Sequence, residues 1–536
     1  MAITGGQAII DTLRAAGVTT VFGIPGVHNL SMYDALYRSP DIDHIVCRHE
    51  QGAGFAADGY ARVSGKTGVF ITTTGPGATN AFTALGEAWT DNSPVLHLAS
   101  QLDRNLIDRN RGVVHELVDQ HGTFRQITRL AESVRTIHQV SPMVARALAA
   151  TQTMRPRPAY LDFPVDMLNE AADIDIQISN QPQPVEAKPS DVERAAEMLA
   201  RAERPVIVAG SGVHRSSASA ELLELAGALN APVFETANGR GAIPSSHRLA
   251  IGGWWHGSDG LHAALADADA TLVAGSRLGQ TDTSGWKAPL KNLIHVDADG
   301  DWINLNYPAE IGLIGHERTV IGQLLEHLEG ASTAAGPAWA ERVANTRRAV
   351  EESMRAEHPR EMGVLDAITS AGGPDAIFTN DSLIQYWTSR QLPVERPRSY
   401  LYPAVYGTLG SALPFAIGAA IAAPERPVIS ISGDGAFMFT CQELATAVQY
   451  GVNITCVICN DHGYGAMRRH QRNRYGDYTY ATDLATPDFA AMAESFGARG
   501  VKLESTRELE GALRESINAA GPTVIDMTLE LDVPWM

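Results

Sequence analysis

The chain has 536 residues, of which 44% are hydrophobic and 19% are charged, and its formal net charge at pH 7 is −19. This length exceeds what one hydrophobic core usually serves, and the acidic balance disfavours nucleic acid and anionic membrane surfaces as partners. No apolar run approaches the ~20 residues that a membrane-spanning helix needs, and the start of the chain lacks the pattern of a signal peptide. We therefore expect a cytoplasmic protein with no membrane or nucleic-acid partner.

Short β-branched runs alternate with helical stretches along the chain. The run at 205–209 is apolar throughout, and the runs at 270–274 and 454–458 each contain a single threonine among apolar residues, which is typical of parallel strands covered on both faces. The proline-rich stretch 178–191 and the stretch 330–362 interrupt this pattern and indicate linkers. The sequence therefore predicts an α/β fold of three doubly wound parallel-sheet domains, with boundaries at 1–177, 190–330 and 360–536.

Glycine-rich loops follow the first predicted elements. Residues 22–26 read FGIPG after a helix, and residues 73–80 read TTGPGATN after a strand. Glu50 begins an Ala/Gly-rich helical stretch, where by itself it is an ordinary acid favoured by the helix macrodipole.

The central segment carries a weaker glycine pattern. Residues 210–213 read GSGV and residues 275–277 read GSR, each after a predicted strand. This pattern is found in dinucleotide-binding folds, but the later acid and the spacing of that fingerprint do not match. We expect an empty central domain, with FAD as the alternative.

Two acidic loops follow neighbouring predicted strands of the last segment. Asp434 lies in the Gly-Asp-Gly-Ala stretch 433–436, and Asp461 follows the next strand, with 24 residues (436–459) between the two motifs. This spacing fits one βαβ crossover, which places both loops at the same sheet edge. Carboxylate and carbonyl oxygens suit Mg²⁺, and flanking glycines let the backbone approach a phosphate. The segment predicts a metal and diphosphate site.

The segment from Gly433 to Tyr464 resembles the signature of thiamine-diphosphate enzymes, Gly-Asp-Gly followed about two dozen residues later by Asn-Asn. Asp461 replaces the second Asn here, which adds one negative charge beside the metal. The resemblance spans the chain and is to the family of acetolactate synthases, 2-oxo acid decarboxylases and benzaldehyde lyase. It implies pyrimidine-binding, central and diphosphate-binding domains in that order, and Asp434, Asp461 and the Gly463 carbonyl as Mg²⁺ ligands.

The resemblance also implies residue roles. In this family the residue that matches Glu50 hydrogen-bonds the aminopyrimidine and promotes proton removal from the thiazolium. Leu409 would force the bent shape of the cofactor, while the Gly407 carbonyl meets its amino group. The implied cofactor-binding residues are Pro25, Gly26, Glu50, Thr74, Asn80, Ser382, Gly407, Leu409, Gly433, Asp434, Gly435, Ala436, Asp461, Gly463, Tyr464 and Gly465. Because the family builds each site from two subunits, a homodimer or homotetramer is expected.

His28 and His115 are the expected further catalytic residues. His28 falls where benzaldehyde lyase carries a His, and His115 where acetolactate synthases carry a Gln. An imidazole at either position could relay protons or orient a substrate carboxylate, and a hydrogen-bonded structural His is the alternative for each.

The resemblance leaves the reaction open between several members of the family. We expect decarboxylation of a pyruvate-like 2-oxo acid, after which the enamine is protonated or adds to a second carbonyl. The alternatives are a 5-guanidino-2-oxopentanoate decarboxylase, a benzaldehyde-lyase-like enzyme that cleaves 2-hydroxy ketones, and a flavin-dependent pyruvate oxidase. A guanidinium substrate would need an acid, for which Glu116, Asp119 and Asp381 are candidates. A non-catalytic paralogue is disfavoured because both metal acids and Glu50 are present.

Overall fold

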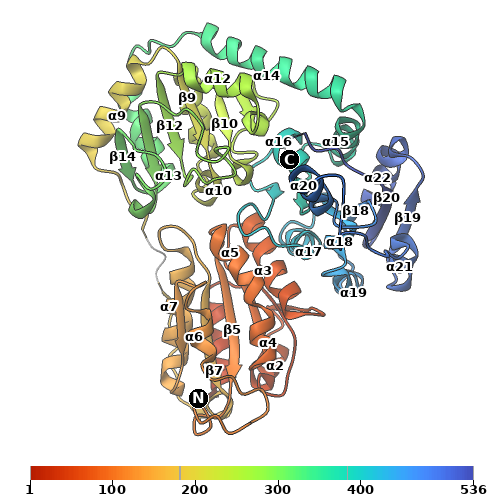
Figure 1. Cartoon of the computed structure of the whole chain (residues 1–536). Coiled ribbons are helices and arrows are strands. Elements are labelled where there is room, and N and C mark those ends of the chain that lie inside the picture. Colours follow the sequence, from red (N-terminus) through yellow and green to blue (C-terminus); the bar gives the residue numbers. More distant parts are fainter. Residues whose placement is uncertain (1, 180–182, 383, 535–536) are drawn as a thin grey trace.

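The computed structural model describes residues 2–179, 183–382 and 384–534. Its strands form three six-stranded sheets in which every pairing is parallel, and helices cover both faces of each (Figure 1). The predicted α/β class with three doubly wound sheets is therefore confirmed. Residues 180–182 of the predicted first linker, Met1 and residues 535–536 lie outside the described residues.

The amino-terminal sheet has the order β3-β2-β4-β5-β7-β6, and a two-stranded antiparallel pair, β1 and β8, lies beside it. Strands β4, β5 and β7 are buried along their whole length, as expected for central strands with helices on both faces. The elements are β1 Ile3–Thr4, α1 Gly5–Ala15, β2 Thr20–Gly23, α2 Leu30–Tyr37, β3 Asp43–Val46, α3 Glu50–Ser64, β4 Gly68–Thr72, α4 Pro76–Asn80, α5 Phe82–Thr90, β5 Val95–Gln101, α6 Gln120–Phe124, β6 Leu130–Ser133, α7 Val140–Gln152, β7 Ala159–Pro164, α8 Val165–Asn169 and β8 Ala171–Ala172.

The central sheet has the order β11-β10-β9-β12-β13-β14. Its domain is joined to the last one by the long helix α14, which crosses the top of Figure 1 and occupies most of the predicted second linker. The elements are α9 Pro189–Arg201, β9 Pro205–Ala209, α10 Ser211–Arg215, α11 Ser219–Ala228, β10 Val233–Glu235, β11 Ala250–Gly252, α12 Asp259–Asp267, β12 Ala270–Ala274, β13 Leu293–Asp297, β14 Ile311–Ile314, α13 Glu317–Leu328 and α14 Pro337–Glu357.

The carboxyl-terminal sheet has the order β16-β15-β17-β18-β20-β19. The order in which strands are added reverses between the parallel strands β15 and β17, because the chain continues from β15 to β16 on one side and from β17 to β18 on the other. Such a switch point opens a crevice at the carboxyl ends of the two strands, where doubly wound sheets bind ligands. The elements are α15 Pro359–Gly372, β15 Ile377–Asn380, α16 Gln385–Gln391, β16 Tyr400–Leu401, α17 Ala412–Ala422, β17 Val428–Gly433, α18 Asp434–Phe437, α19 Leu444–Gln449, β18 Thr455–Asn460, α20 Gly465–Tyr475, α21 Phe489–Ser495, β19 Arg499–Leu503, α22 Leu509–Ile517 and β20 Thr523–Thr528.

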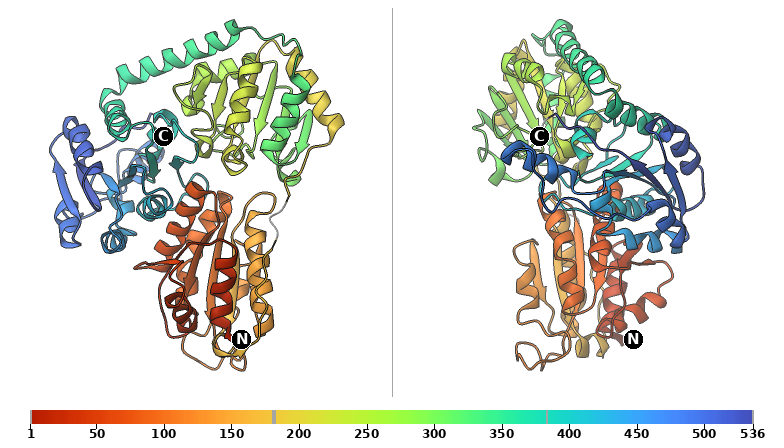
Figure 2. Two further views of the ribbon diagram at one scale, coloured as in Figure 1. Left: turned by 180° about the vertical axis from the view of Figure 1, so that it is seen from behind. Right: turned by 45° about the vertical axis from the view of Figure 1, so that its right-hand side comes forward.

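The amino-terminal and carboxyl-terminal domains pack against each other through α3 and α17. Glycines permit a very close approach, since a Cβ at Gly59 would lie 2.4 Å from the Phe415 carbonyl oxygen. A Cβ at Gly418 would lie 1.9 Å from the carbonyl oxygen of Ala56. The two domains lie side by side in both views of Figure 2. The interface is therefore formed by helix backbones in direct contact.

Candidate functional site

The switch point of the carboxyl-terminal sheet brings the two predicted acidic loops together. Strand β17 pairs with β18 in parallel register, with Gly433 opposite Cys459, so Asp434 and Asp461 follow at one edge. The Oδ2 atom of Asp434 accepts a hydrogen bond of 2.8 Å from the backbone N–H of Gly463. The predicted crossover is thus present, and its two carboxylates face the same space.

A cavity opens between these loops. Ten of the predicted cofactor-binding residues line it, together with residues of the loop after β20 and the start of α20. The lining residues are Ser382, Ile384, Leu409, Gly433, Asp434, Gly435, Ala436, Cys459, Asp461, Gly463, Tyr464, Gly465, Ala466, Met467, Leu529 and Leu531. Sequence reasoning missed Leu529 and Leu531, although their position after β20, the neighbour of β18, was a usable signal.

The charges in this cavity suit a divalent cation. Burial, together with the neighbouring Asp434 carboxylate, raises the pKa of Asp461 to about 7. Burial also raises the pKa of Asp434. Among the described residues no group of three or more His, Cys, Asp or Glu could hold a metal. A metal here would therefore need backbone carbonyls and ligand oxygens to complete its shell, as Mg²⁺ bound to a phosphate does.

The loop that carries Leu409 is braced by a buried aspartate. Gly407 and Gly410 have φ values of 71° and 79°, a left-handed conformation that favours glycine. The Oδ2 atom of Asp381 accepts hydrogen bonds from the N–H groups of Gly410 (3.0 Å) and Ala412 (3.2 Å). Leu409 is held at the cavity wall in this way, while Gly407 lies outside the lining residues.

The amino-terminal domain presents Glu50 at the first turn of α3. The amide Nδ2 of Asn80 donates a hydrogen bond of 2.9 Å to Glu50 Oε2. A Cβ at Gly77 would lie 3.3 Å from the other carboxylate oxygen, so the loop 73–80 closes on this acid. Glu50 follows β3, and the loop with Asn80 follows β4. The switch point of this sheet lies between β2 and β4.

The other predicted residues of this domain lie around the same loop. A Cβ at Gly26, the residue after Pro25, would lie 2.6 Å from Thr73, so the two glycine-rich loops touch. The hydroxyl of Thr74 is buried and hydrogen-bonds that of Ser100 at 2.9 Å. The Thr74 side chain thus holds the loop in place, and its hydroxyl already has a hydrogen-bond partner.

The rings of His28 and His115 pack against each other beside these loops, with their planes inclined by 34°. Their ring centroids are 4.9 Å apart, and no described residue hydrogen-bonds their buried Nδ1 atoms. Burial, and then the neighbouring His115, lowers the pKa of His28, while Asp103 opposes the shift. A pair of imidazoles with free ring nitrogens can exchange protons with a substrate.

The three acids considered for a guanidinium already have partners. Glu116 accepts hydrogen bonds from three backbone N–H groups of residues 111–113, at 2.6 to 3.1 Å. Asp119 caps α6 by accepting from the N–H of Gly122 at 2.9 Å. Asp381 braces the Leu409 loop, as described above. Asp381 is buried with both oxygens bonded, whereas Asp119 is exposed and keeps room for a further donor.

At the strand ends of the central sheet, Asp297 pairs with Arg155 of the amino-terminal domain. The guanidinium of Arg155 lies 2.5 Å from the carboxylate of Asp297, with both side chains buried, and stacks over Trp302 at 4.3 Å. Gly212 and Gly275 pack so closely that a Cβ on Gly212 would lie 2.4 Å from the Gly275 Cα. These glycines therefore serve loop packing.

Within one chain, the cavity around Asp434 and the loops around Glu50 do not form a single site. Among the described residues, those lining the cavity around Asp434 include no residue of the amino-terminal domain. Exposed apolar side chains flank both halves: Val27 and Val114 beside the two histidines, and Phe439 and Met467 beside the cavity. Such side chains mark a surface suited to association.

Sequence comparisons give three matches in chain order. Residues 3–123 match the thiamine pyrophosphate enzyme N-terminal TPP binding domain, residues 192–324 the central domain, and residues 383–527 the C-terminal TPP binding domain. No helix of the described residues is long and apolar enough to cross a membrane.

Relatives match over almost the whole chain. A probable acetolactate synthase large subunit of Methanocaldococcus jannaschii is 34% identical over 98% of this chain and 92% of its own length. A probable 2-ketoarginine decarboxylase of Pseudomonas aeruginosa is 36% identical over 98% of this chain and 94% of its own. The acetolactate synthase isozyme 2 large subunit of Escherichia coli is 31% identical over 99% and 97%.

Proposed function

The chain belongs to the thiamine pyrophosphate enzymes, and from this premise we propose that it decarboxylates a pyruvate-like 2-oxo acid and transfers the product to a second carbonyl. Its acetolactate-synthase-like character rests on the family matches and the relatives. The observation that carries the proposal is the cavity at the β15/β17 switch point, where Asp434 and Asp461 converge.

The residues of this cavity fit thiamine diphosphate held through Mg²⁺. The carboxylates of Asp434 and Asp461 and the carbonyl of Gly463 would bind the ion, which would in turn bind the diphosphate. The negative charge of Asp461 compensates for the small number of protein ligands. When bound, the thiazolium supplies the electron sink for cleavage of the carbon–carbon bond. Leu409, fixed by the brace at Asp381, would support the cofactor between the two rings.

A second copy of the chain would supply the acid. Glu50 lies outside the cavity of its own chain, while exposed apolar side chains flank both halves. In a symmetric dimer, each chain would place its Glu50 against the cofactor held by its partner, giving two sites per pair. There Glu50 would hold and transfer a proton at the aminopyrimidine nitrogen.

His28 and His115 would act on the substrate. An imidazole pair can hold the substrate carbonyl or carboxylate by hydrogen bonds and move a proton to or from it. The burial that lowers the pKa of His28 favours its neutral form near pH 7. The Nδ1 atoms of both rings are buried and lack partners among the described residues, so each keeps an unused hydrogen-bonding position.

A panel of 2-oxo acids tests the proposal. Carbon dioxide release and product mass are measured together, with and without an aldehyde or second 2-oxo acid as acceptor, in thiamine diphosphate and Mg²⁺. We expect decarboxylation of pyruvate or a close analogue and a ligated product when an acceptor is present. No release from any 2-oxo acid would contradict the proposal.

A 2-ketoarginine-type decarboxylase is the second candidate, because one relative with 36% identity carries that name. The guanidino 2-oxo acid belongs in the same panel. Preference for it, with aldehyde as the only product, would select this candidate. Asp381 is buried with both oxygens hydrogen-bonded, whereas Glu116 and Asp119 lie at the surface, so the product analysis decides between the two candidates.

We also propose that the central domain works without FAD. The strand ends where a dinucleotide would bind hold the Arg155–Asp297 pair and the stacked Trp302. An absorbance scan of the purified protein should show no flavin band near ~450 nm. A band in stoichiometric amount would overturn this part of the proposal.

A further inference from the structure

Two buried glutamates cross the interface between the amino-terminal and carboxyl-terminal domains in opposite directions. Glu87 of α5 reaches the loop that carries Leu409, and Glu443, directly before α19, reaches the backbone directly before Glu50. Their side chains are 0% and 1% exposed. Each therefore touches a segment that the proposed function places against the cofactor.

We propose that Glu87 and Glu443 are a reciprocal pair of positioning residues, each fixing the cofactor-facing segment of the domain opposite to its own. This inference rests on the proposed function, because it takes Glu50 and Leu409 as the residues that act on the cofactor. Neither glutamate touches the cavity or Glu50 itself, so each acts through another residue.

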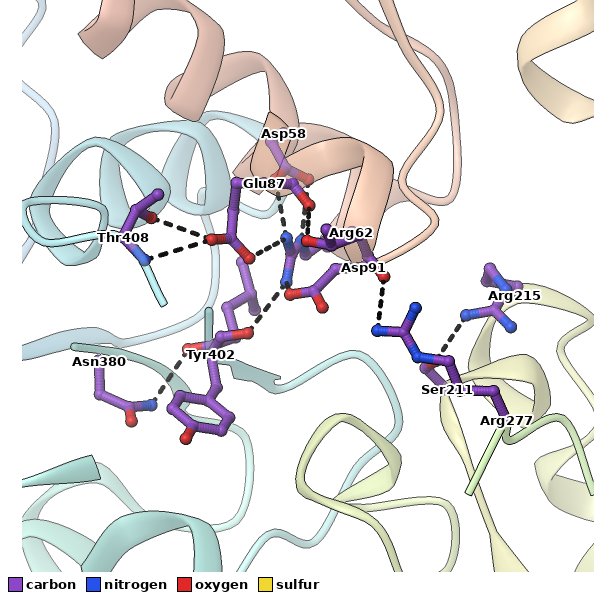
Figure 3. A network of polar contacts seen from close by, with 12 residues as sticks. Asp58, Arg62, Glu87, Asp91, Ser211, Arg215, Arg277, Asn380, Tyr402 and Thr408 are labelled. Carbon is purple, nitrogen blue, oxygen red and sulfur yellow. Dashed lines mark hydrogen bonds and ion pairs between the residues drawn. The ribbon is translucent and has the colours of Figure 1, made fainter. Parts of the chain in front are cut away.

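Glu87 holds the Leu409 loop through its neighbour. The hydroxyl of Thr408 donates a hydrogen bond of 3.0 Å to Glu87 Oε2, and the backbone N–H of Thr408 approaches the same oxygen at 3.5 Å. On the other side of Glu87 lie Arg62 and Asp91, and Figure 3 shows the glutamate between them and Thr408. The loop is thus fixed from two directions, by Glu87 at one end and by Asp381 at the other.

The surroundings of Glu87 explain how its carboxyl group is tolerated there. One guanidinium, that of Arg62, faces three carboxyl groups: Asp58 at 2.8 Å, Asp91 at 3.1 Å and Glu87 at 3.9 Å. Burial, and then the neighbouring Asp91, raises the pKa of Glu87 well above its usual range. A glutamine has a carbonyl oxygen of the same reach, so Glu87→Gln should preserve the oxygen that accepts from Thr408.

Glu443 holds the chain directly before Glu50. Its Oε1 atom accepts hydrogen bonds from the N–H groups of Arg48 (3.0 Å) and His49 (2.9 Å). Its Oε2 atom accepts from the Thr446 hydroxyl at 2.7 Å and from the same Arg48 N–H at 3.2 Å. Because both oxygens accept, a glutamine would turn an N–H₂ group toward a donor. The absence of a side chain at Gly52 makes room, since a Cβ there would lie 2.4 Å from Glu443 Oε1.

The two glutamates therefore predict different defects. Loss of the Glu87 contact frees the loop of Leu409 and should weaken cofactor binding. Loss of the Glu443 contact shifts Glu50 and should slow turnover while cofactor binding is kept. In the proposed dimer, the Glu87 of a chain serves the cavity of its own chain, and its Glu443 serves the cavity of the partner.

The test uses Glu87→Ala, Glu87→Gln, Thr408→Val and Glu443→Gln in the full-length protein. The Kd of thiamine diphosphate is measured by tryptophan fluorescence in saturating Mg²⁺, beside kcat and KM for the 2-oxo acid. We expect Glu87→Ala and Thr408→Val to raise this Kd about tenfold, and Glu87→Gln to restore it to within about twofold of wild type. Glu443→Gln should lower kcat at least about tenfold and leave Kd and KM within about twofold.

Ser245→Ala is the matched control. Ser245 joins the central domain to Val394 by hydrogen bonds of 2.9 and 3.0 Å, away from both cofactor segments. It should leave Kd and kcat unchanged. Equal changes in this control, or a wild-type Kd in Glu87→Ala and Thr408→Val, would overturn the proposal. If Glu87→Ala does not fold, Thr408→Val tests the contact between Glu87 and the Leu409 loop in its place. Wild-type activity that needs no thiamine diphosphate would instead refute the proposed function.

Discussion

The carboxyl-terminal and amino-terminal domains have the same kind of sheet but present their switch points differently. In the carboxyl-terminal domain the strand ends enclose a cavity with two buried carboxylates and Leu409 at its wall. In the amino-terminal domain the strand ends carry Glu50 and two histidines on an open surface, flanked by the exposed Val27 and Val114. One domain can hold a ligand, and the other can act on it.

Under the proposed function, binding and proton transfer therefore fall to separate domains. A metal–diphosphate anchor needs buried, converging oxygens, which a single sheet edge supplies. An acid that reaches a cofactor bound elsewhere has to project from the surface. In the central domain, Asp297 at the end of β13 forms a buried ion pair with Arg155 of the amino-terminal domain.

Glu50→Gln removes the proposed acid of the amino-terminal domain and has the largest expected effect on turnover. We expect kcat to fall by about a thousandfold, since a positioned acid or base contributes roughly 10² to 10⁴. The Kd of thiamine diphosphate in Mg²⁺ should stay near that of wild type because the anchor is intact. Turnover that survives unchanged in this variant would remove Glu50 from the mechanism.

Leu409→Ala tests the other side with a smaller expected effect. Removal of the side chain from the cavity wall should lower kcat about tenfold to a hundredfold, because a small misplacement of the reacting groups is costly. The variant should still bind Mg²⁺ and cofactor through the Asp434 loop. Steady-state kinetics together with the cofactor Kd check this, and a variant as active as wild type would contradict the role of Leu409.

Asp461→Asn has the smallest expected effect on activity. The change removes one negative charge beside the proposed Mg²⁺ and keeps an oxygen ligand. We expect the Mg²⁺ concentration for half-maximal activity to rise about threefold to tenfold, with kcat changed less than about threefold. A Mg²⁺ titration at saturating cofactor measures this. An unchanged or lower Mg²⁺ requirement would show that Asp461 is not a ligand.

The sequence was sufficient for the fold class and for ten of the residues around the cavity. The spacing between Gly433 and Asp461 defines one crossover, and parallel strands must then place both loops at one edge. It was insufficient for Glu87 and Glu443, which look like ordinary acids of surface helices. Their contacts join residues 321 and 395 positions apart, and no local pattern encodes such pairs. Asp381 was one of three candidate acids for a guanidinium substrate, and its contacts with the Leu409 loop were not predicted because they depend on tertiary packing.

A mixed dimer tests the central claim, that one chain binds the cofactor and its partner supplies the acid. Glu50→Gln chains with one tag and Asp434→Asn chains with another are co-expressed, and the doubly tagged species is purified. Each parent protein should be nearly inactive. The mixed dimer should have one intact and one doubly defective site, and hence about half of the wild-type activity per dimer. Activity no higher than that of the parents would contradict a site shared between two chains.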